Sequence, residues 1–209
     1  MRLLVTYDAS ALQTLISGLD EAGQGKIRTN IAGAINKVGG HVHDALIEPL
    51  KIQTGLKGST IPRALHDSPA GENGLAYQIV ARGGDINLKY FGAREDGDGV
   101  TAFPRGVRTH FAGAFIKSGR KPNRQPSPKL NGQVYTRISG GKNISMNGKP
   151  KWKGSWGGQI KKQKSGVFIP EEMVRGESLR AFNRIVNKEL PSEMSGILTM
   201  MIGGRKLSE

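Results

Sequence analysis

The sequence predicts an α+β protein, with N-terminal helices, a central antiparallel β-sheet and C-terminal helices. Apolar residues recur every three or four positions near both ends of the chain, as in amphipathic helices. They alternate in the middle, as in half-buried strands, and 40 Gly and Pro residues supply turns. The sheet is expected to form a sandwich or a partial barrel with long basic loops. A single domain is expected over 1–209, helical in 1–55 and 171–203, with strands in 75–139 and 166–170 and a basic Gly/Lys loop in 140–165.

The N-terminal region predicts two helices. The first spans 8–21, and Gly23 and Gly25 interrupt the pattern after it. The second spans 26–48 and is expected to end at Pro49. Its apolar stripe consists of Ile27, Ile31, Ile35, Val38, Val42, Ala45 and Leu46.

Alternating apolar residues then predict the strands. Segments 75–81 and 86–91 are expected to pair through a hairpin at Arg82–Asp85. A looser hairpin is expected in 100–111, with its turn at Pro104–Gly106. Further strands are expected at 113–117 and 133–139, which pair with each other, and at 166–169.

The C-terminal region predicts helices again. Glu171 and Glu172 favour a helix N-terminus, where negative charge is stabilised by the helix dipole. An amphipathic helix is expected to follow, and Pro191 is expected to kink or restart it. Its apolar face consists of Leu179, Phe182, Ile185, Val186, Leu190, Met194, Ile197, Leu198 and Met201.

The net charge of +14 is concentrated in one part of the chain. Residues 99–170 contain 15 Lys or Arg and no acid, whereas the other 137 residues contain 16 basic and 17 acidic side chains. A charge confined in this way predicts a surface for a polyanion or for an acidic protein face.

Composition and motifs argue against catalysis. The absence of cysteine excludes disulfides and thiolate chemistry, and no phosphate loop or nucleophile elbow is found. We expect a protein that is not an enzyme, with no catalytic, metal or cofactor site. The first ten residues do not resemble a signal peptide, and no apolar run is long enough to span a membrane, so a soluble protein of the cytosol is expected.

Two groups of residues raise a metal hypothesis that the spacing does not support. His41 and His43 lie two positions apart on a predicted helix, so their side chains point in nearly opposite directions. Asp96 and Asp98 lie in a sequence similar to part of a calcium loop, but the required later Glu is missing. Solvated or packed histidines and a solvated turn are the preferred interpretations.

The segment "KPKWKGSWGG" is the most distinctive functional candidate. Its lysines and tryptophans could follow phosphates and stack on bases, could anchor the loop in a neighbouring subunit, or could hold the loop on its own sheet. Trp152 and Trp156 are the expected interface anchors. The expected DNA-facing or assembly-facing cations are Lys117, Arg120, Lys121, Arg124, Lys142, Lys149, Lys151, Lys153, Lys161, Lys162 and Lys164.

A series of short motifs follows in a recognisable order. The run begins with an expected strand that ends at Phe91, and it continues with Gly99-Val100, the basic turn Arg105–Arg108, Ala114–Ile116, Val134–Arg137 and Ile169-Pro170. Two further motifs lie outside this run, Ala34–Val38 before it and Leu190–Met194 after it. This order resembles the minor tail protein Z family of tailed bacteriophages. The segment between Ser139 and Gly166 is longer and richer in Lys and Gly than the family pattern.

The resemblance implies a tail-completion-like domain in a virion protein without a catalytic site. It implies a ring, expected to be a hexamer, at the head-proximal end of the tail, with genomic DNA passing non-specifically through the lumen. The implied partners are other copies of the chain and the tail terminator, tail tube or head connector, with no membrane. The implied location is the tail or neck of the virion, and the host cytoplasm during assembly.

The alternative is a free basic nucleic-acid-binding protein, favoured by the sequence pI of about 10.2. Such proteins usually carry Lys and Arg along their binding helices, whereas the helices expected here are nearly neutral.

Overall fold

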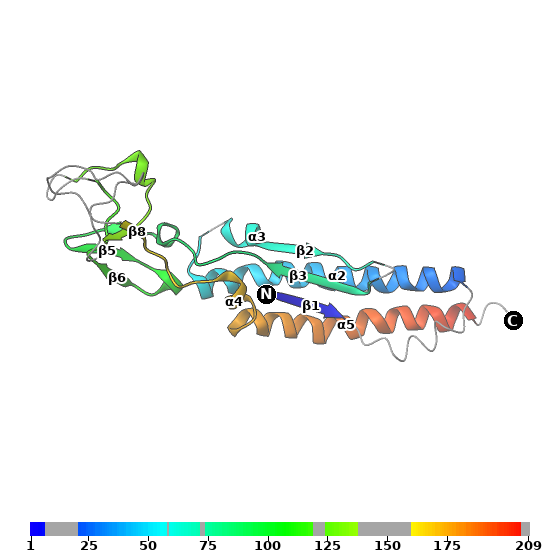
Figure 1. Ribbon diagram of the computed structural model, residues 1–209. Helices are drawn as coiled ribbons and strands as arrows, with labels where there is room; N and C mark the ends of the chain where they lie inside the picture. The colour runs from blue at the N-terminus through cyan, green and yellow to red at the C-terminus, as the bar shows by residue number, and fades with distance from the viewer. Residues whose placement is uncertain (7–20, 58, 72–73, 119–123, 138–159, 206–209) are drawn as a thin grey trace. The chain divides into compact units, whose positions relative to one another are not determined.

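A computed structural model describes residues 1–6, 21–57, 59–71, 74–118, 124–137 and 160–205 (Figure 1). The chain divides into two compact units. The helical unit comprises Met1–Gln53, Ser59–Gly83 and Ile169–Glu209, and the basic unit comprises Thr54–Gly58 and Gly84–Phe168. The expected helix at 8–21 lies almost wholly outside the described residues, as do Arg120, Lys121, Lys142, Lys149, Lys151, Lys153, Trp152 and Trp156.

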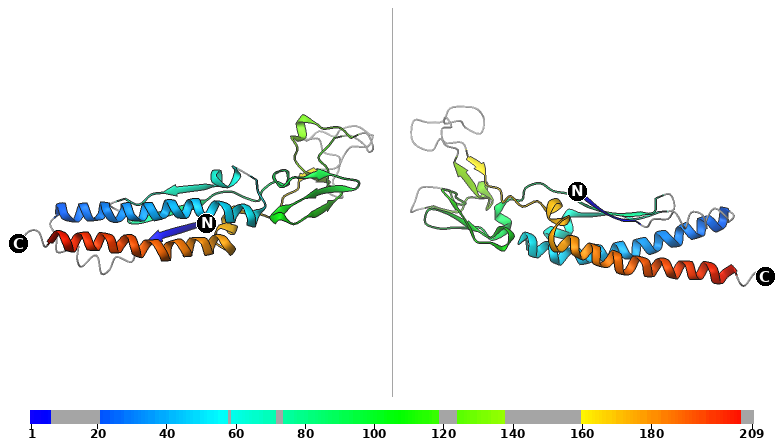
Figure 2. Two further views of the ribbon diagram at one scale, coloured as in Figure 1. Left: turned by 180° about the vertical axis from the view of Figure 1, so that it is seen from behind. Right: turned by 90° about the horizontal axis from the view of Figure 1, so that it is seen from below.

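Two long helices form the main part of the helical unit: α2 (Glu21–Thr54) and α5 (Gly176–Arg205). They lie side by side in every view (Figures 1 and 2). They run antiparallel, because Lys37 pairs with Glu193 while His41, further along α2, pairs with the earlier Glu189. The expected apolar stripe of α2 is confirmed at its buried positions, Ile31, Ile35, Val38, Val42 and Leu46, and it continues to Leu50.

Neither Gly25 nor Pro49 bounds a helix, which corrects two sequence expectations. Helix α2 begins at Glu21 and continues past Pro49 to Thr54, and α5 continues through Pro191. A glycine in a helix costs only about 1 kcal/mol relative to alanine. A proline costs more, but Leu50 and Thr54 are fully buried one and two turns beyond Leu46, so packing favours a continued helix.

A three-stranded antiparallel sheet completes the helical unit, in the order β1-β3-β2. Its strands are β1 (Arg2–Thr6), β2 (Leu65–Ser68) and β3 (Ala76–Ala81), and the short helix α3 (Thr60–Ala64) precedes β2. Tyr77, Ile79 and Ala81 alternate as buried residues on β3, as expected. A Cβ at Gly39 would lie 2.3 Å from the Tyr77 ring, so this glycine lets the ring lie directly against α2.

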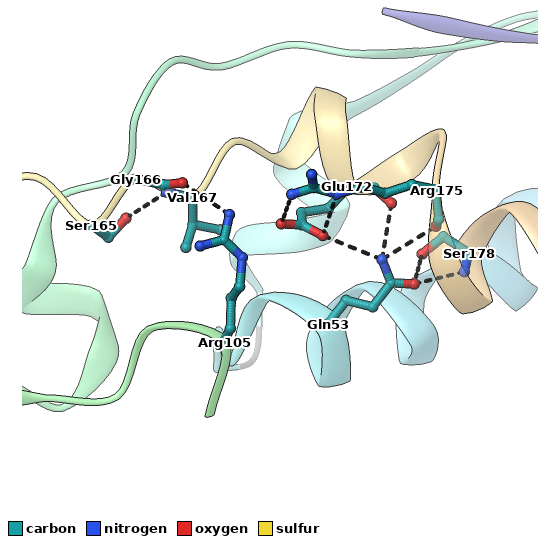
Figure 3. Close-up of polar contacts among 8 residues, drawn as sticks. All are labelled: Gln53, Arg105, Ser165, Gly166, Val167, Glu172, Arg175 and Ser178. Atoms are coloured by element: carbon teal, nitrogen blue, oxygen red, sulfur yellow. Dashed lines mark hydrogen bonds and ion pairs between the residues drawn. The ribbon is translucent and has the colours of Figure 1, made fainter. Parts of the chain in front are cut away.

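The chain enters α5 through a short helix rather than through the expected strand at 166–169. Helix α4 (Ile169–Met173) buries Ile169, Glu172 and Met173, and the expected acidic first turn at Glu171 and Glu172 is confirmed. Gln53 holds the α4–α5 junction (Figure 3). Its Nε2 donates to the carbonyls of Glu172 and Arg175, at 3.1 and 3.3 Å. Its Oε1 accepts from Ser178 N and Oγ, at 2.7 and 2.9 Å.

The basic unit contains two small antiparallel sheets. One has the order β4-β5-β6, formed by Arg94–Glu95, Gly99–Ala102 and Thr109–Ala112. The expected hairpin between β5 and β6 is confirmed, with the 3₁₀ turn η2 (Pro104–Gly106) between the strands. The other sheet pairs β7 (Tyr135–Arg137) with β8 (Ile160–Lys162), and the turn η3 (Pro128–Leu130) precedes β7.

The structure confirms the α+β class and corrects the arrangement of the strands. The described strands form three small sheets and no closed barrel, in place of one central sheet, and β8 lies inside the expected 140–165 loop. Segment 86–91 contains a 3₁₀ helix, η1 (Leu88–Phe91), in place of the expected strand. Its buried residues Leu88 and Phe91 lie three positions apart, which puts their side chains on the same face of a 3₁₀ helix. Strand β3 therefore pairs with β1 and β2 rather than forming a hairpin at Arg82–Asp85. Of the expected pairing between 113–117 and 133–139, the structure shows a bridge between Phe115 and Tyr135.

Candidate functional site

The basic unit contains the whole charge imbalance of the protein. It carries 18 Lys or Arg and 4 Asp or Glu, a net charge of +14, whereas the helical unit carries 13 of each sign. The division of the chain into a basic part and a neutral part thus coincides with its division into two structural units. Because helices α2, α4 and α5 belong almost entirely to the neutral unit, the cationic surface is formed by short strands and loops.

Glu95 is one of the four acids, and it neutralises one of the expected surface cations. Its side chain is 7% exposed and forms an ion pair with Arg124, while its Oε2 accepts from the backbone N of Ile116 and Lys117 at 2.9 and 2.8 Å. Burial favours the neutral acid, but the hydrogen bonds from Arg124 and the two amides outweigh it and lower the pKa of Glu95. The charge of Arg124 is therefore balanced inside the unit.

Arg124 also contributes to an aromatic cluster. Its guanidinium carbon lies 5.7 Å from the centre of the Phe115 ring, and that of Arg137 lies 5.4 Å from the same centre. The Tyr135 ring stacks on Phe115 with their centres 6.2 Å apart. Cation–π and stacking contacts of this kind hold the segment that carries Arg124 against Phe115, which in turn stacks on Tyr135 of β7. Arg124 is thus a structural residue of this unit.

Asp85 fixes the chain after β8. Its Oδ1 accepts from Gly166 N at 2.9 Å and from Ser165 Oγ at 3.4 Å. Lys164 Nζ donates to the Asp85 carbonyl at 3.0 Å, so this expected cation has a partner within the unit. Arg105 Nη2 donates to the Gly166 carbonyl at 3.0 Å (Figure 3). The backbone of Arg105 has a φ of +56°, an uncommon conformation for a residue with a side chain.

Four of the expected cations are exposed on described residues: Lys117, Lys161, Lys162 and Lys164, of which Lys164 donates to the Asp85 carbonyl. Lys161 and Lys162 follow one another on β8, where they pair with Thr136 and Tyr135, so their side chains leave opposite faces of the ladder. The unit exposes further cations that the expected set omits: Lys57, Arg94, Arg105, Arg108, Lys129 and Arg137. Four of these lie in the acid-free stretch 99–170, which was the signal that could have identified them.

Three of the four histidines lie beside carboxylates, two in the helical unit and one in the basic unit. In the helical unit, His41 lies 2.7 Å from Glu189 on α5, and His43 lies 2.8 Å from Asp67 on β2, so the two rings turn toward different elements, as their spacing predicts. In the basic unit, His110 lies close to Asp96 and Asp98, the other two acids. The sequence did not reveal this last grouping, because Asp98 and His110 are twelve positions apart and only the β5–β6 pairing brings them together.

Comparisons with protein-family models, with curated proteins and with solved structures give no match to this chain. None of the helices in the described part of the chain has both the length and the apolar character that crossing a bilayer requires.

Proposed function

We propose that this protein is a structural component of a tailed-phage virion, which forms a ring at the head-proximal end of the tail around the DNA channel. The resemblance of its motif order to the minor tail protein Z family motivates the proposal. The observation that carries it is the confinement of the +14 charge to one compact unit, while the other unit has no net charge.

A protein that lines a DNA channel must attract phosphates without holding them firmly, because the DNA has to leave. Lysines on short strands and loops, such as Lys161 and Lys162, make electrostatic contacts that salt screens and that do not depend on base sequence. An excess of carboxylates in the same place would repel every passing phosphate. The basic unit suits this role, since Glu95 already forms an ion pair with Arg124.

The helical unit would supply the contacts between subunits. It exposes several large apolar side chains, among them Ile52 at 71% and Met200 at 76%. Single exposed apolar residues are ordinary, but burial against a neighbouring copy would stabilise them. In this assignment the neutral unit serves assembly and the basic unit contacts DNA.

The test is native mass spectrometry of the full chain over a range of salt, with and without a short DNA duplex and purified tails. A discrete ring, or a monomer that forms one only in the presence of tails, supports the proposal if DNA binding is also weak and abolished by salt. A persistent monomer that binds duplex tightly would overturn it and would favour the free nucleic-acid-binding protein, because the same charge suits both functions.

A further inference from the structure

Three metal-ligating side chains meet at the turn between β4 and β5. Asp96, Asp98 and His110 each offer one ligand atom, and the three atoms all lie within 4.8 Å of one another. His110 Nε2 lies 3.2 Å from Asp98 Oδ1, and His110 Nδ1 lies 3.5 Å from Asp96 Oδ2. The imidazole is therefore flanked by a carboxylate at each ring nitrogen.

The backbone fixes these residues before any ligand arrives. Asp96 N donates to the Gly99 carbonyl at 3.1 Å, and Gly113 N donates to the Asp98 carbonyl at 2.8 Å. The β5–β6 ladder places His110 directly opposite Thr101. A Cβ at Gly99 would lie 2.9 Å from the His110 ring, so the glycine leaves room for the imidazole.

A hydroxyl group orients one of the carboxylates. Thr101 Oγ1 donates to Asp96 Oδ2 at 2.5 Å. Outer-shell hydrogen bonds of this kind hold metal ligands in position. Thr101 therefore fixes the direction in which one Asp96 oxygen points.

The charges around the group also favour a cation. Although the basic unit contains 18 Lys and Arg, the ion pairs found for Asp96 and Asp98 among the described residues are with His110 alone. In the described part of the chain the two carboxylates therefore stand with no Lys or Arg paired to them, and the group lacks a permanent positive charge. A divalent cation would supply that charge.

We propose that Asp96, Asp98 and His110 bind a divalent transition-metal ion such as Zn²⁺ or Co²⁺. One imidazole nitrogen and two carboxylate oxygens suit these ions, whereas Ca²⁺ and Mg²⁺ prefer oxygen ligands throughout. The three side chains are exposed, so water can complete the coordination shell. This inference does not rest on the proposed function, and either one can fail without the other.

The experiment is a titration of the tag-free full chain, freed of metal with a chelator. Zn²⁺ binding is measured by calorimetry and Co²⁺ binding by visible absorption. We expect saturation at one ion per chain and a raised melting temperature, because a ligand that binds only the folded state stabilises it. Binding should weaken in acid, because protons compete with a metal ion for its ligands.

Two variants and a matched control locate the site. His110→Gln and Asp98→Asn should each reduce affinity by about tenfold or more. Asp98 is 83% exposed, so its substitution leaves the fold intact. His43→Gln removes another histidine that contacts an aspartate, in the helical unit, and should leave affinity unchanged. The absence of saturable binding would overturn the proposal, as would binding that survives both His110→Gln and Asp98→Asn.

Discussion

Gln53, at the end of α2, accepts two hydrogen bonds from Ser178, in the first turn of α5. The first N–H groups of a helix have no partner within the helix, and Gln53 Oε1 satisfies that of Ser178 at 2.7 Å. The same side chain donates to carbonyls of the α4–α5 junction, so one amide group connects three helices. Ser178 is fully buried, so water cannot replace this contact.

We therefore expect Gln53→Leu to lower the free energy of unfolding by about 2 kcal/mol, because it leaves buried donors without a partner. Glu48→Gln, five residues earlier on the exposed side of α2, is the control and should change the free energy of unfolding little. Urea unfolding followed by far-UV circular dichroism measures both variants. Equal effects would show that the Gln53 contacts do not stabilise the junction.

Two adjacent glycines of α2 should respond in opposite ways to the same substitution. Gly39→Ala places a Cβ 2.3 Å from the Tyr77 ring and should destabilise the protein by about 1–3 kcal/mol through overpacking. At Gly40 a Cβ would meet nothing within 4 Å, so Gly40→Ala should stabilise the protein by about 0.5–1 kcal/mol. Thermal unfolding of the two variants checks the prediction. A stabilising Gly39→Ala would contradict the close packing of Tyr77 on α2.

Glu95 should make stability depend on pH in the acid range. Its pKa is lower in the folded protein than in the unfolded chain. The stabilisation is therefore complete above the ordinary glutamate pKa of about 4.3, and it is lost as the pH falls through the lower folded value. Glu95→Gln should be about 2 kcal/mol less stable than the original protein near neutral pH.

The measurement for Glu95 is urea unfolding of both proteins at several pH values. The difference between them should shrink as the pH is lowered below about 4. Glu177→Gln provides a control on an exposed ion pair with Arg180. A difference between Glu95→Gln and the original protein that does not change with pH would contradict the assigned ion pair.

Lys161 and Lys162 should contribute to DNA binding through charge alone. If both contact phosphates, changing them to Gln should reduce the slope of log affinity against log salt by about 2, equally for unrelated duplex sequences. Arg184→Gln with Lys188→Gln removes two exposed charges from α5 in the helical unit and should leave the slope unchanged. Fluorescence anisotropy over a range of salt measures the slope for both double variants. Equal slopes for the two would refute the assignment of Lys161 and Lys162 to DNA binding.

Local periodicity predicted the features that depend on nearby residues. The buried stripe of α2, the β5–β6 hairpin and the acidic start of α4 all follow from patterns a few residues long. Long-range pairing could not be predicted in this way. Strand β1 pairs with β3, seventy or more residues away, and its five residues carry no signal that names this partner.

The candidate functional residues also divide into those that the sequence predicted and those that depend on long-range contacts. The excess of cations followed from counting, but which of them have partners within the unit depended on contacts between distant residues. Arg124 pairs with Glu95, 29 positions earlier, and His110 approaches Asp98 across a strand pair. The continuation of α2 past Pro49 was likewise decided by burial of Leu50 rather than by local propensity.

The order of the segments has a consequence for synthesis on the ribosome. The helical unit is built from three separate stretches of chain, and α5 follows α2 only after the basic unit has been made. At about 5–20 residues per second, the 121 residues between Thr54, which ends α2, and Gly176, which begins α5, take roughly 6–24 seconds to synthesise. Throughout that interval α5 cannot pack on α2, so we expect nascent chains to be more prone to aggregation until α5 emerges.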